Sequence, residues 1–322
     1  MSGTGVESLA VLITYHNEGD LLRRCLRSLA EQTRPVDEIL VYDDASDIRP
    51  DGHLIGNLPI RVVRGEHNIG PARGRNVLLR QTGAAFVHFH DADDAFEPSW
   101  CERVRTAFDA GDVDAVFTDV RSVTPVGEWR EHVMDLARLE AEKDLVRFCI
   151  QGSMLVPAGT YRRAAVERIG GYRESLWQSE DWDFHVRLAC ARPAYRVIAD
   201  SLVRIYLRAE SRSRDVIAVW RSAVDAIRAL ATEIPTRYRD ELSEAAATAG
   251  MHLFRAGALA EARAAFALAT ELGEPRHAGQ PRIYRALAQH AGQEWAERAG
   301  SLYRRCVPES LRRLTHRRTQ EC

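Results

Sequence analysis

Short apolar runs alternate with stretches of helical periodicity in the first half of the chain. Residues 9–15, 38–42 and 60–64 have the length and the β-prone composition of buried strands, and residues 85–89 form a fourth run of this type. Leu22, Cys25, Leu26 and Leu29 follow the first run at helical spacing. Strands that alternate with helices predict an α/β fold with a mostly parallel sheet and helices on both faces.

The starts and ends of several helices can also be read from the pattern. Asn17, three residues before Asp20, predicts the cap of the first helix, and Pro71 and Pro98 are placed to begin two others. Further along we expect a strand at residues 115–120, a helix at about 136–148 and a strand at 152–156. A helix at 161–169, closed by a pair of glycines, and a helix that opens at residue 180 complete this part of the chain.

The pattern changes at about residue 215 to helices rich in alanine and arginine. We therefore predict two parts, a catalytic domain at residues 1–214 and an α-helical appendage at residues 215–322. Residues 247–272 look like a single tetratricopeptide-type helical hairpin. A last helix at residues 308–318 has two leucines among arginines, which is typical of a solvated terminal helix or of a helix that rests on acidic lipid headgroups.

Composition excludes several classes of protein. The 44 basic and 46 acidic residues nearly balance in 322 residues, which argues against a dedicated nucleic-acid binder. No apolar run is long enough to cross a bilayer and no signal peptide is evident, so we expect a cytoplasmic protein, with peripheral contact to the inner face of the membrane as an alternative. The glycines at 70–74 match neither GxGxxG nor a P-loop, and no GxSxG or CxxC motif occurs.

Polar residues gather where three of the expected strands end. They occupy residues 14–17, the pair Asp43 and Asp44, and the group Asp91, Asp93 and Asp94. Carboxylates are hard oxygen ligands that suit Mg²⁺ or Mn²⁺, and ligands bind at the carboxyl ends of parallel strands. A turn and a helix cap are the alternative, because aspartate is favoured in both. Three such ends on one edge of a sheet favour a nucleotide cleft.

With these pieces placed, residues 9 to about 213 resemble the family-two glycosyltransferases of the GT-A fold. The match is carried by an ordered set of motifs: Tyr15-His16-Asn17-Glu18, Gln32-Thr33, Asp37-Glu38-Ile39, Asp43-Asp44-Ala45-Ser46, Asn68-Ile69-Gly70, Arg75-Asn76, the DXD-type Asp91-Ala92-Asp93-Asp94, Gly170-Gly171-Tyr172 and Glu180-Asp181-Trp182-Asp183. Each motif is short, and their order and spacing together are specific.

The resemblance implies a role for each matching residue. In the nucleotide site, Asp44 would accept a hydrogen bond from the uracil or thymine imide of a UDP- or dTDP-sugar. The other residues implied there are Thr14, His16, Arg75 and Asp91. Asp93 and Asp94 would bind Mn²⁺ or Mg²⁺, which would neutralise the diphosphate leaving group.

For catalysis, the resemblance implies that Asp181, beside Glu180, is the general base. It would take a proton from an acceptor hydroxyl during an in-line attack that inverts the anomeric centre. The three acidic residues of this segment also suit the first turn of a helix, where they offset the helix dipole. The sequence leaves the acceptor, the sugar and the oligomeric state open.

The sequence departs from the family pattern at several points. Ala45 replaces a usual glycine, and His16 stands where an aromatic residue is common. Residues 203–214 hold Tyr206, Arg208, Ser211 and Ser213 but no histidine that could approach the diphosphate. Two other functions remain alternatives: a catalytically weak scaffold that binds nucleotide-sugars, and a nucleotidyltransferase that makes them. His88 and His90, on the central strand, are expected in the core or behind the carboxylates and not as metal ligands.

Overall fold

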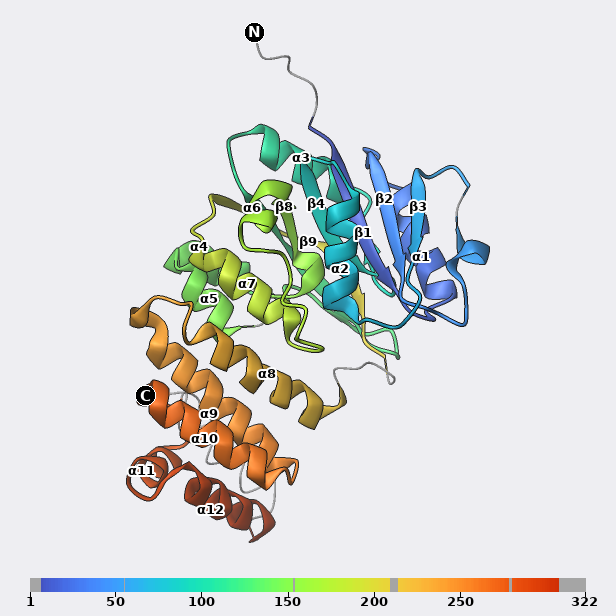
Figure 1. Ribbon diagram of the computed structural model, residues 1–322. Coiled ribbons are helices and arrows are strands. Elements are labelled where there is room, and N and C mark those ends of the chain that lie inside the picture. Colours follow the sequence, from blue (N-terminus) through green and yellow to red (C-terminus); the bar gives the residue numbers. More distant parts are fainter. Residues whose placement is uncertain (1–6, 55, 153, 209–213, 278–279, 307–322) are drawn as a thin grey trace. The chain divides into compact units, whose positions relative to one another are not determined.

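The computed structural model describes residues 7–54, 56–152, 154–208, 214–277 and 280–306, with side chains up to residue 303. The chain divides into two compact units, Met1–Ser211 and Arg212–Cys322, close to the division expected after residue 214. The first unit contains the sheet and the second is helical (Figure 1).

Nine strands form a single sheet in the described part of the chain, in the order β3-β2-β1-β4-β8-β6-β9-β5, with β7 paired to β6. Their bounds are β1 Leu9–Tyr15, β2 Glu38–Asp43, β3 Ile60–Arg64, β4 Phe86–Asp91, β5 Ala95–Phe96, β6 Ala115–Val123, β7 Trp129–Arg130, β8 Gly159–Arg162 and β9 Tyr195–Tyr206. The longer pairings, β1 with β2 and β4, β2 with β3, and β6 with β9, are parallel. The predicted α/β fold with a mostly parallel sheet is confirmed.

Helices cover both faces of this sheet, with α1 and α2 on opposite sides (Figure 1). The helices of the first unit are α1 Asp20–Ala30, α2 Pro71–Gln81, α3 Trp100–Asp109, α4 Leu136–Glu142, α5 Leu145–Gln151, α6 Arg163–Arg168 and α7 Glu180–Cys190, with 3₁₀ turns at Pro50–His53 and Val156–Ala158. The four apolar residues expected on one face of α1 are all buried. Each such side chain contributes about 1.5–3 kcal/mol of burial free energy, which holds α1 against the sheet.

Three predicted element boundaries are wrong. Asn17 does not cap α1, whose N-cap is Gly19; its Oδ1 accepts a hydrogen bond from the Ile48 amide at 2.9 Å instead. The helix expected at 136–148 is broken at Lys143, whose φ of 52° ends α4 before α5 begins. The helix expected at 161–169 is shorter, because its first residues belong to β8, which fills the place between β4 and β6.

Two strand predictions also differ from the structure. No strand forms at the described residues within 152–156, where the chain instead leads into a 3₁₀ turn. The longest strand, β9, was not predicted, because Arg196, Asp200 and Arg204 interrupt its apolar pattern. The glycine pair closes α6 as expected, since Gly170 and Gly171 have φ of 75° and 71°.

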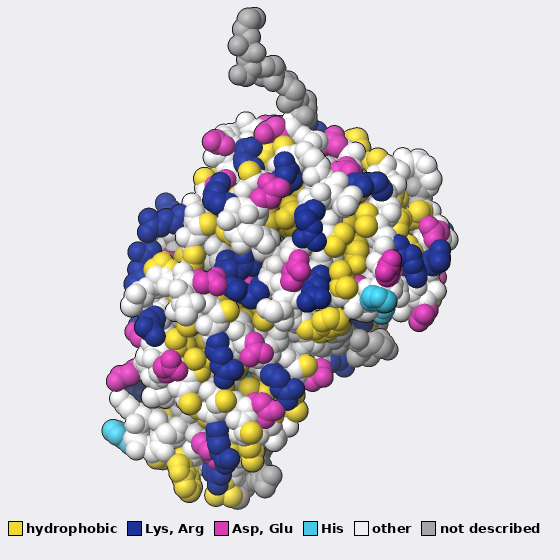
Figure 2. Space-filling view, viewed as in Figure 1, with side chains coloured by type: hydrophobic (Ala, Val, Ile, Leu, Met, Phe, Trp, Pro, Cys, Tyr) yellow, Lys and Arg dark blue, Asp and Glu magenta, His cyan; other side chains and the backbone are white. Residues whose placement is uncertain are grey.

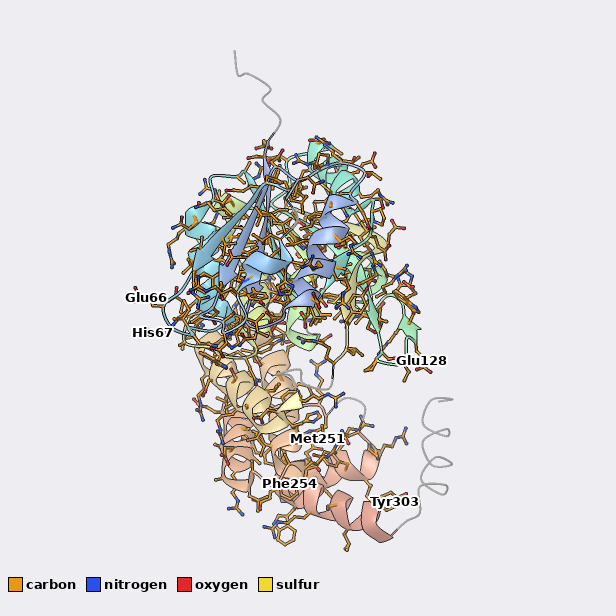
Figure 3. All side chains as sticks on the ribbon, turned by 90° about the vertical axis from the view of Figure 1, so that its right-hand side faces the viewer. Glu66, His67, Glu128, Met251, Phe254 and Tyr303 are labelled. Carbon is orange, nitrogen blue, oxygen red and sulfur yellow. The ribbon has the colours of Figure 1, made fainter. Side chains whose placement is uncertain are left out.

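The second unit consists of helices α8 Val216–Leu230, α9 Arg239–Arg255, α10 Leu259–Leu272, α11 Arg282–Ala291 and α12 Gln293–Cys306, with a 3₁₀ turn at Thr236–Tyr238. Asp215 caps α8 by accepting a hydrogen bond from the Ala218 amide at 3.0 Å. Helices α9 and α10 form the predicted hairpin, and Phe266 packs where a side chain at Gly250 would stand. In Figure 3, α9 can be found by its labelled residues Met251 and Phe254, and α12 by Tyr303.

The structure bears on the expectation that no segment of the chain crosses a membrane. Among the residues described, no helix has the length and apolar character needed to cross a membrane. The helix expected at 308–318 lies outside the described residues. On the face drawn in Figure 2, the described basic and acidic side chains are interspersed.

Candidate active site

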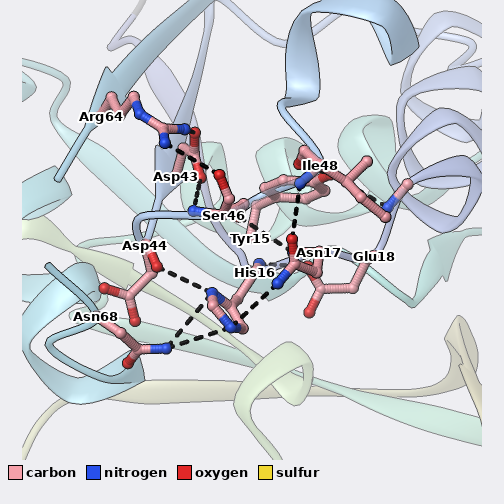
Figure 4. A network of polar contacts seen from close by, with 11 residues as sticks. Tyr15, His16, Asn17, Glu18, Asp43, Asp44, Ser46, Ile48, Arg64 and Asn68 are labelled. Carbon is pink, nitrogen blue, oxygen red and sulfur yellow. Dashed lines mark hydrogen bonds and ion pairs between the residues drawn. The ribbon is translucent and has the colours of Figure 1, made fainter. Parts of the chain in front are cut away.

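The ends of β1, β2 and β4 lie side by side at one edge of the sheet. In the strand register, Tyr15 is opposite Asp43 and Thr14 is opposite Asp91. The three polar strand ends that the sequence singled out therefore meet in space, as predicted. Glu66 and His67 lie on the loop after β3 (Figure 3). The next residue of this loop, Asn68, lies beside His16 at the same edge (Figure 4).

Asp44, directly after β2, connects this strand end to the loop after β3 and to His16 after β1 (Figure 4). Its carboxylate is buried and accepts hydrogen bonds from the amides of Ile69 at 2.7 Å and Gly70 at 2.9 Å. The imidazole Nδ1 of His16 lies 2.9 Å from the Asp44 carbonyl oxygen, and the Asn68 amide nitrogen lies 3.4 Å from both ring nitrogens. Because a carboxylate oxygen has two acceptor sites, Asp44 retains capacity to accept from a ligand N–H group.

The turn after β2 is fixed by Asp43. This carboxylate is fully buried, pairs with Arg64 and accepts a hydrogen bond from the Ser46 amide at 3.0 Å (Figure 4). Ala45, which replaces the usual glycine, has a φ of 56°. The turn therefore keeps the left-handed conformation that glycine adopts without strain, and Ala45 carries the conformational cost.

Gly70 is confined by an aromatic side chain that the sequence analysis did not single out. Its φ is 81°, and a Cβ atom added there would lie 2.9 Å from the indole ring of Trp177. The indole is 52% exposed, so it lies at the surface between the loop held by Asp44 and the start of α7. Sequence spacing gives no signal for this contact, because the two residues are on separate segments.

We expect Gly70→Ala to destabilise the first unit by about 1–3 kcal/mol and to weaken the nucleotide binding that the resemblance implies here, since it adds a left-handed alanine and a collision with Trp177. Gly127→Ala is the matched control, because Gly127 has a φ of 82° and no atom near its missing Cβ. Thermal melting and a UDP titration would measure both effects. Equal losses of UDP affinity in the two variants would contradict the role of the Trp177 contact.

The carboxylates after β4 have different partners. Asp91 Oδ1 accepts a hydrogen bond from Arg75 Nη2 at 2.8 Å and lies 3.4 Å from the Thr14 hydroxyl. Asp93 pairs with Arg208, and Asp94 accepts a hydrogen bond from the Tyr206 amide at 3.1 Å. Arg208 was noted in the sequence only for standing where a histidine is common.

The acidity of this cluster is weakened by its surroundings. Burial raises the pKa of Asp93, and the negative charge of Asp91 raises it further, while Arg208 opposes the shift. Burial and the negative charges of Asp93 and Asp91 raise the pKa of Asp94 well above its usual value. A divalent cation would relieve this repulsion.

The donor chemistry fits such a cation at Asp93 better than at Asp94. Within the described ranges, no three His, Cys, Asp or Glu side chains are gathered into a ready-made metal cluster. The Asp93 side chain is 22% exposed, whereas Asp94 is buried and turned toward the β9 backbone. Asp93 would thus be the accessible oxygen ligand, and Asp94 would have to give up its backbone hydrogen bond to become a second one.

The first turn of α7 carries three acidic residues with distinct environments. Glu180 Oε1 accepts a hydrogen bond from Arg75 Nη1 at 2.8 Å. Asp183 is fully buried and paired with Arg173 and Arg187. Burial, together with the charge of Glu180, raises the pKa of Asp181 to about 7. A carboxylate with this pKa suits a general base, which helix-dipole compensation alone would not require.

Arg75, which the resemblance implied for the nucleotide site, is buried in the structure. Its side chain is only 2% exposed and is enclosed between Asp91 and Glu180. Both terminal nitrogens of its guanidinium therefore donate to carboxylates of the protein. The remaining residues implied for the nucleotide site, Thr14, His16 and Asp44, lie at the sheet edge described above.

The two histidines of β4 belong to the core, as expected. His88 and His90 are fully buried and pack against Phe96, and His88 also packs against Trp100. Burial lowers the pKa of His90 to about 4 and that of His88 well below its usual value, so both rings are neutral at pH 7.

This combination of a largely parallel sheet, clustered carboxylates at its strand ends and an acidic helix start is the arrangement of the GT-A class. The family model of glycosyl transferase family 2 matches residues 10–170, half of the chain, and the protein belongs to this family. An uncharacterized glycosyltransferase of Haemophilus influenzae is 27% identical over 184 residues, which are 56% of this chain and 61% of that protein. The uncharacterized glycosyltransferase YwdF of Bacillus subtilis is 26% identical, over 67% of this chain and 81% of its own.

Solved structures agree on the fold. Residues 1–349 of S. aureus TarS, in complex with UDP-GlcNAc, superpose with a TM-score of 0.57, covering 89% of this chain and 92% of that one. The sequence identity is 18%, so the likeness establishes the fold alone.

Proposed function

We propose that the protein is an inverting, metal-dependent glycosyltransferase that moves a sugar from a UDP- or dTDP-sugar to an acceptor hydroxyl in glycan, polysaccharide or glycoconjugate biosynthesis. The observation that carries this proposal is the arrangement of three groups: Asp44 at the sheet edge, Asp91 of the DXD segment, and Glu180, which shares Arg75 with Asp91 and immediately precedes Asp181 on α7. Family membership and the presence of both acidic groups favour an active enzyme over the scaffold alternative.

The donor end would be recognised by Asp44. An imide N–H, which uracil and thymine carry, can donate to this carboxylate, whereas cytosine has an unprotonated ring nitrogen at the same position. His16 and Asn68 would lie beside the base. The complexes of TarS with UDP and UDP-GlcNAc support a uridine donor as the first choice to test.

The diphosphate end would be held near the DXD segment. Asp93, and Asp94 after a change of partner, would hold Mn²⁺ or Mg²⁺, which supplies positive charge to the departing diphosphate. Asp91 would lie beside the ribose. Arg208, which pairs with Asp93, adds a guanidinium at the same place.

Chemistry would take place at the start of α7. Asp181 would accept the proton of the acceptor hydroxyl while that oxygen attacks the anomeric carbon from the side opposite the diphosphate. One bond forms as the other breaks, so the configuration at that carbon inverts. The pKa of about 7 keeps a large fraction of Asp181 ionised at neutral pH while leaving it basic enough to take the proton.

A thermal-shift screen tests the donor site. We expect UDP or dTDP with Mn²⁺ to raise the melting temperature, because a ligand that binds the folded state alone stabilises it by about 2.7 kcal/mol at a concentration of about 100 Kd. Asp93→Ala should lose the metal-dependent part of the shift and Asp44→Ala the preference for uracil or thymine. The exposed Glu66 provides the control, Glu66→Ala, which should behave as the wild type. Equal shifts with GDP and CDP would contradict the proposal.

A further inference from the structure

Arg75 is a charged residue buried at the centre of the site. It lies on α2, and its side chain is 2% exposed. Burying a guanidinium is unfavourable unless carboxylates and hydrogen bonds compensate the lost hydration. The partners of Arg75 therefore decide what this residue does.

Two carboxylates from distant parts of the chain share this guanidinium. Nη2 donates to Asp91 Oδ1 at 2.8 Å, and Nη1 donates to Glu180 Oε1 at 2.8 Å. The Tyr172 ring lies below the guanidinium, 5.0 Å from it. A rigid planar fork can hold two carboxylates at a fixed separation, which a single ammonium group does far less well.

The two carboxylates belong to the two functional halves of the site. Asp91 ends β4, at the edge where the nucleotide would bind, and Glu180 begins α7 immediately before Asp181. Glu180 is itself buried, so its side chain is fixed together with the helix start. Arg75 thus connects the donor edge to the residue that would take the proton.

We propose that Arg75 is a positioning residue that sets the first turn of α7 against the end of β4, so that Asp181 stands at a fixed place across from the donor. The proposal rests on the proposed function, in which Asp181 is the base. It excludes direct contact of Arg75 with the nucleotide. The positive charge of Arg75 also opposes the effect of burial on the pKa of Asp181, which gives the role a measurable signature.

Arg75→Gln and Arg75→Lys test this role, and Arg105→Gln is the matched control. Arg105 is also buried and also pairs with a carboxylate, that of Asp37, away from the site. The reaction measured is hydrolysis of UDP-GlcNAc and UDP-glucose, which requires no knowledge of the acceptor. We expect Arg75→Gln to lower kcat about 10- to 100-fold through misplacement of Asp181, with the KM for the donor changed less than about 3-fold.

The pH profile separates positioning from a merely structural role. In Arg75→Gln the acidic limb of the kcat profile should move to higher pH, because the charge that opposes protonation of Asp181 is gone. Arg75→Lys should retain the limb and lose part of kcat, since a lysine keeps the charge but not the fork. Arg105→Gln should leave both kcat and the acidic limb of its pH profile unchanged. An increase in donor KM with kcat and the limb unchanged would overturn the proposal in favour of a nucleotide contact.

Hydrogen exchange tests the same idea without relying on catalysis. Amides at the start of α7 should exchange faster in Arg75→Gln than in the wild type and in Arg105→Gln. Unchanged exchange there overturns the positioning role whatever the activity. Faster exchange in a protein whose wild type releases no sugar from any nucleotide-sugar would mean that the proposed function is wrong and the positioning contact is real.

Discussion

Asp181→Asn should lower kcat for sugar transfer by roughly 10²- to 10⁴-fold, the usual contribution of a positioned general base. Asparagine has nearly the same shape and cannot accept the proton as the acceptor oxygen attacks. The proposed nucleotide contacts lie elsewhere, on Asp44 and the end of β4, so the Kd for UDP should stay within about 3-fold of the wild type. Initial rates with UDP-sugars and a UDP titration measure the two quantities. Full activity in this variant would exclude Asp181 as the base.

The raised pKa of Asp181 determines how the rate and the stability should change with pH. Because the pKa of Asp181 is raised to about 7, the side chain is protonated and inactive well below that pH, and the rate should rise as pH passes through about 7. The same shift affects stability, since the folded protein holds this proton more tightly than the unfolded chain. Stability contributed by Asp181 should therefore decrease as pH rises from about 4 to 7, and Asp181→Asn should remove that decrease.

The sheet could be predicted where its strands are buried on both faces. Strands β1, β2 and β4 are such strands, and a continuous apolar run is what the sequence must supply there. Strand β9 lies between β6 and β5 and has exposed charged positions and a shifted register against β6 near Asp119. Its sequence therefore shows neither a continuous run nor a clean alternation, and it was missed.

The site could be predicted as a list of carboxylates but not as a set of pairings. Parallel topology alone requires that Asp44 and Asp91 meet at one edge. The sequence cannot show that Arg75 is enclosed, that Arg208 pairs with Asp93, or that Trp177 lies on Gly70. Each of these contacts joins segments far apart in the chain, and no local pattern encodes their distance.

The acidic turn of α7 illustrates the same limit, because its members do different things. The sequence predicts Asp183 as part of the acidic helix start, and the structure shows it fully buried between two arginines. Its Oδ1 accepts from Arg173 Nε at 2.9 Å and its Oδ2 from Arg187 Nε at 2.8 Å. Arg187 also donates to the carbonyl oxygens of Ile169 and Gly171, so the pairing fastens α7 to the glycine turn.

We therefore expect Asp183→Ala to reduce the free energy of unfolding of the first unit by about 3–5 kcal/mol, the usual cost of leaving one member of a buried ion pair without its partner. Urea denaturation followed by tryptophan fluorescence measures this change. The ion pair of Glu167, which is exposed, with the half-buried Arg163 provides the control, and Glu167→Ala should cost less than about 1 kcal/mol.

The outcome also bears on catalysis, because Asp183 lies two residues after Asp181 on the same helical turn. If Asp183→Ala lowers the free energy of unfolding by less than about 1 kcal/mol, the two carbonyl contacts of Arg187, together with water, are enough to compensate its buried charge. A large loss would show that Asp181, the proposed base, stands on a helix start anchored at two points, through Asp183 to the turn at Gly170 and Gly171 and through Glu180 to Arg75. Weakening the first anchor should then lower kcat even at temperatures where Asp183→Ala remains folded, whereas Glu167→Ala should not.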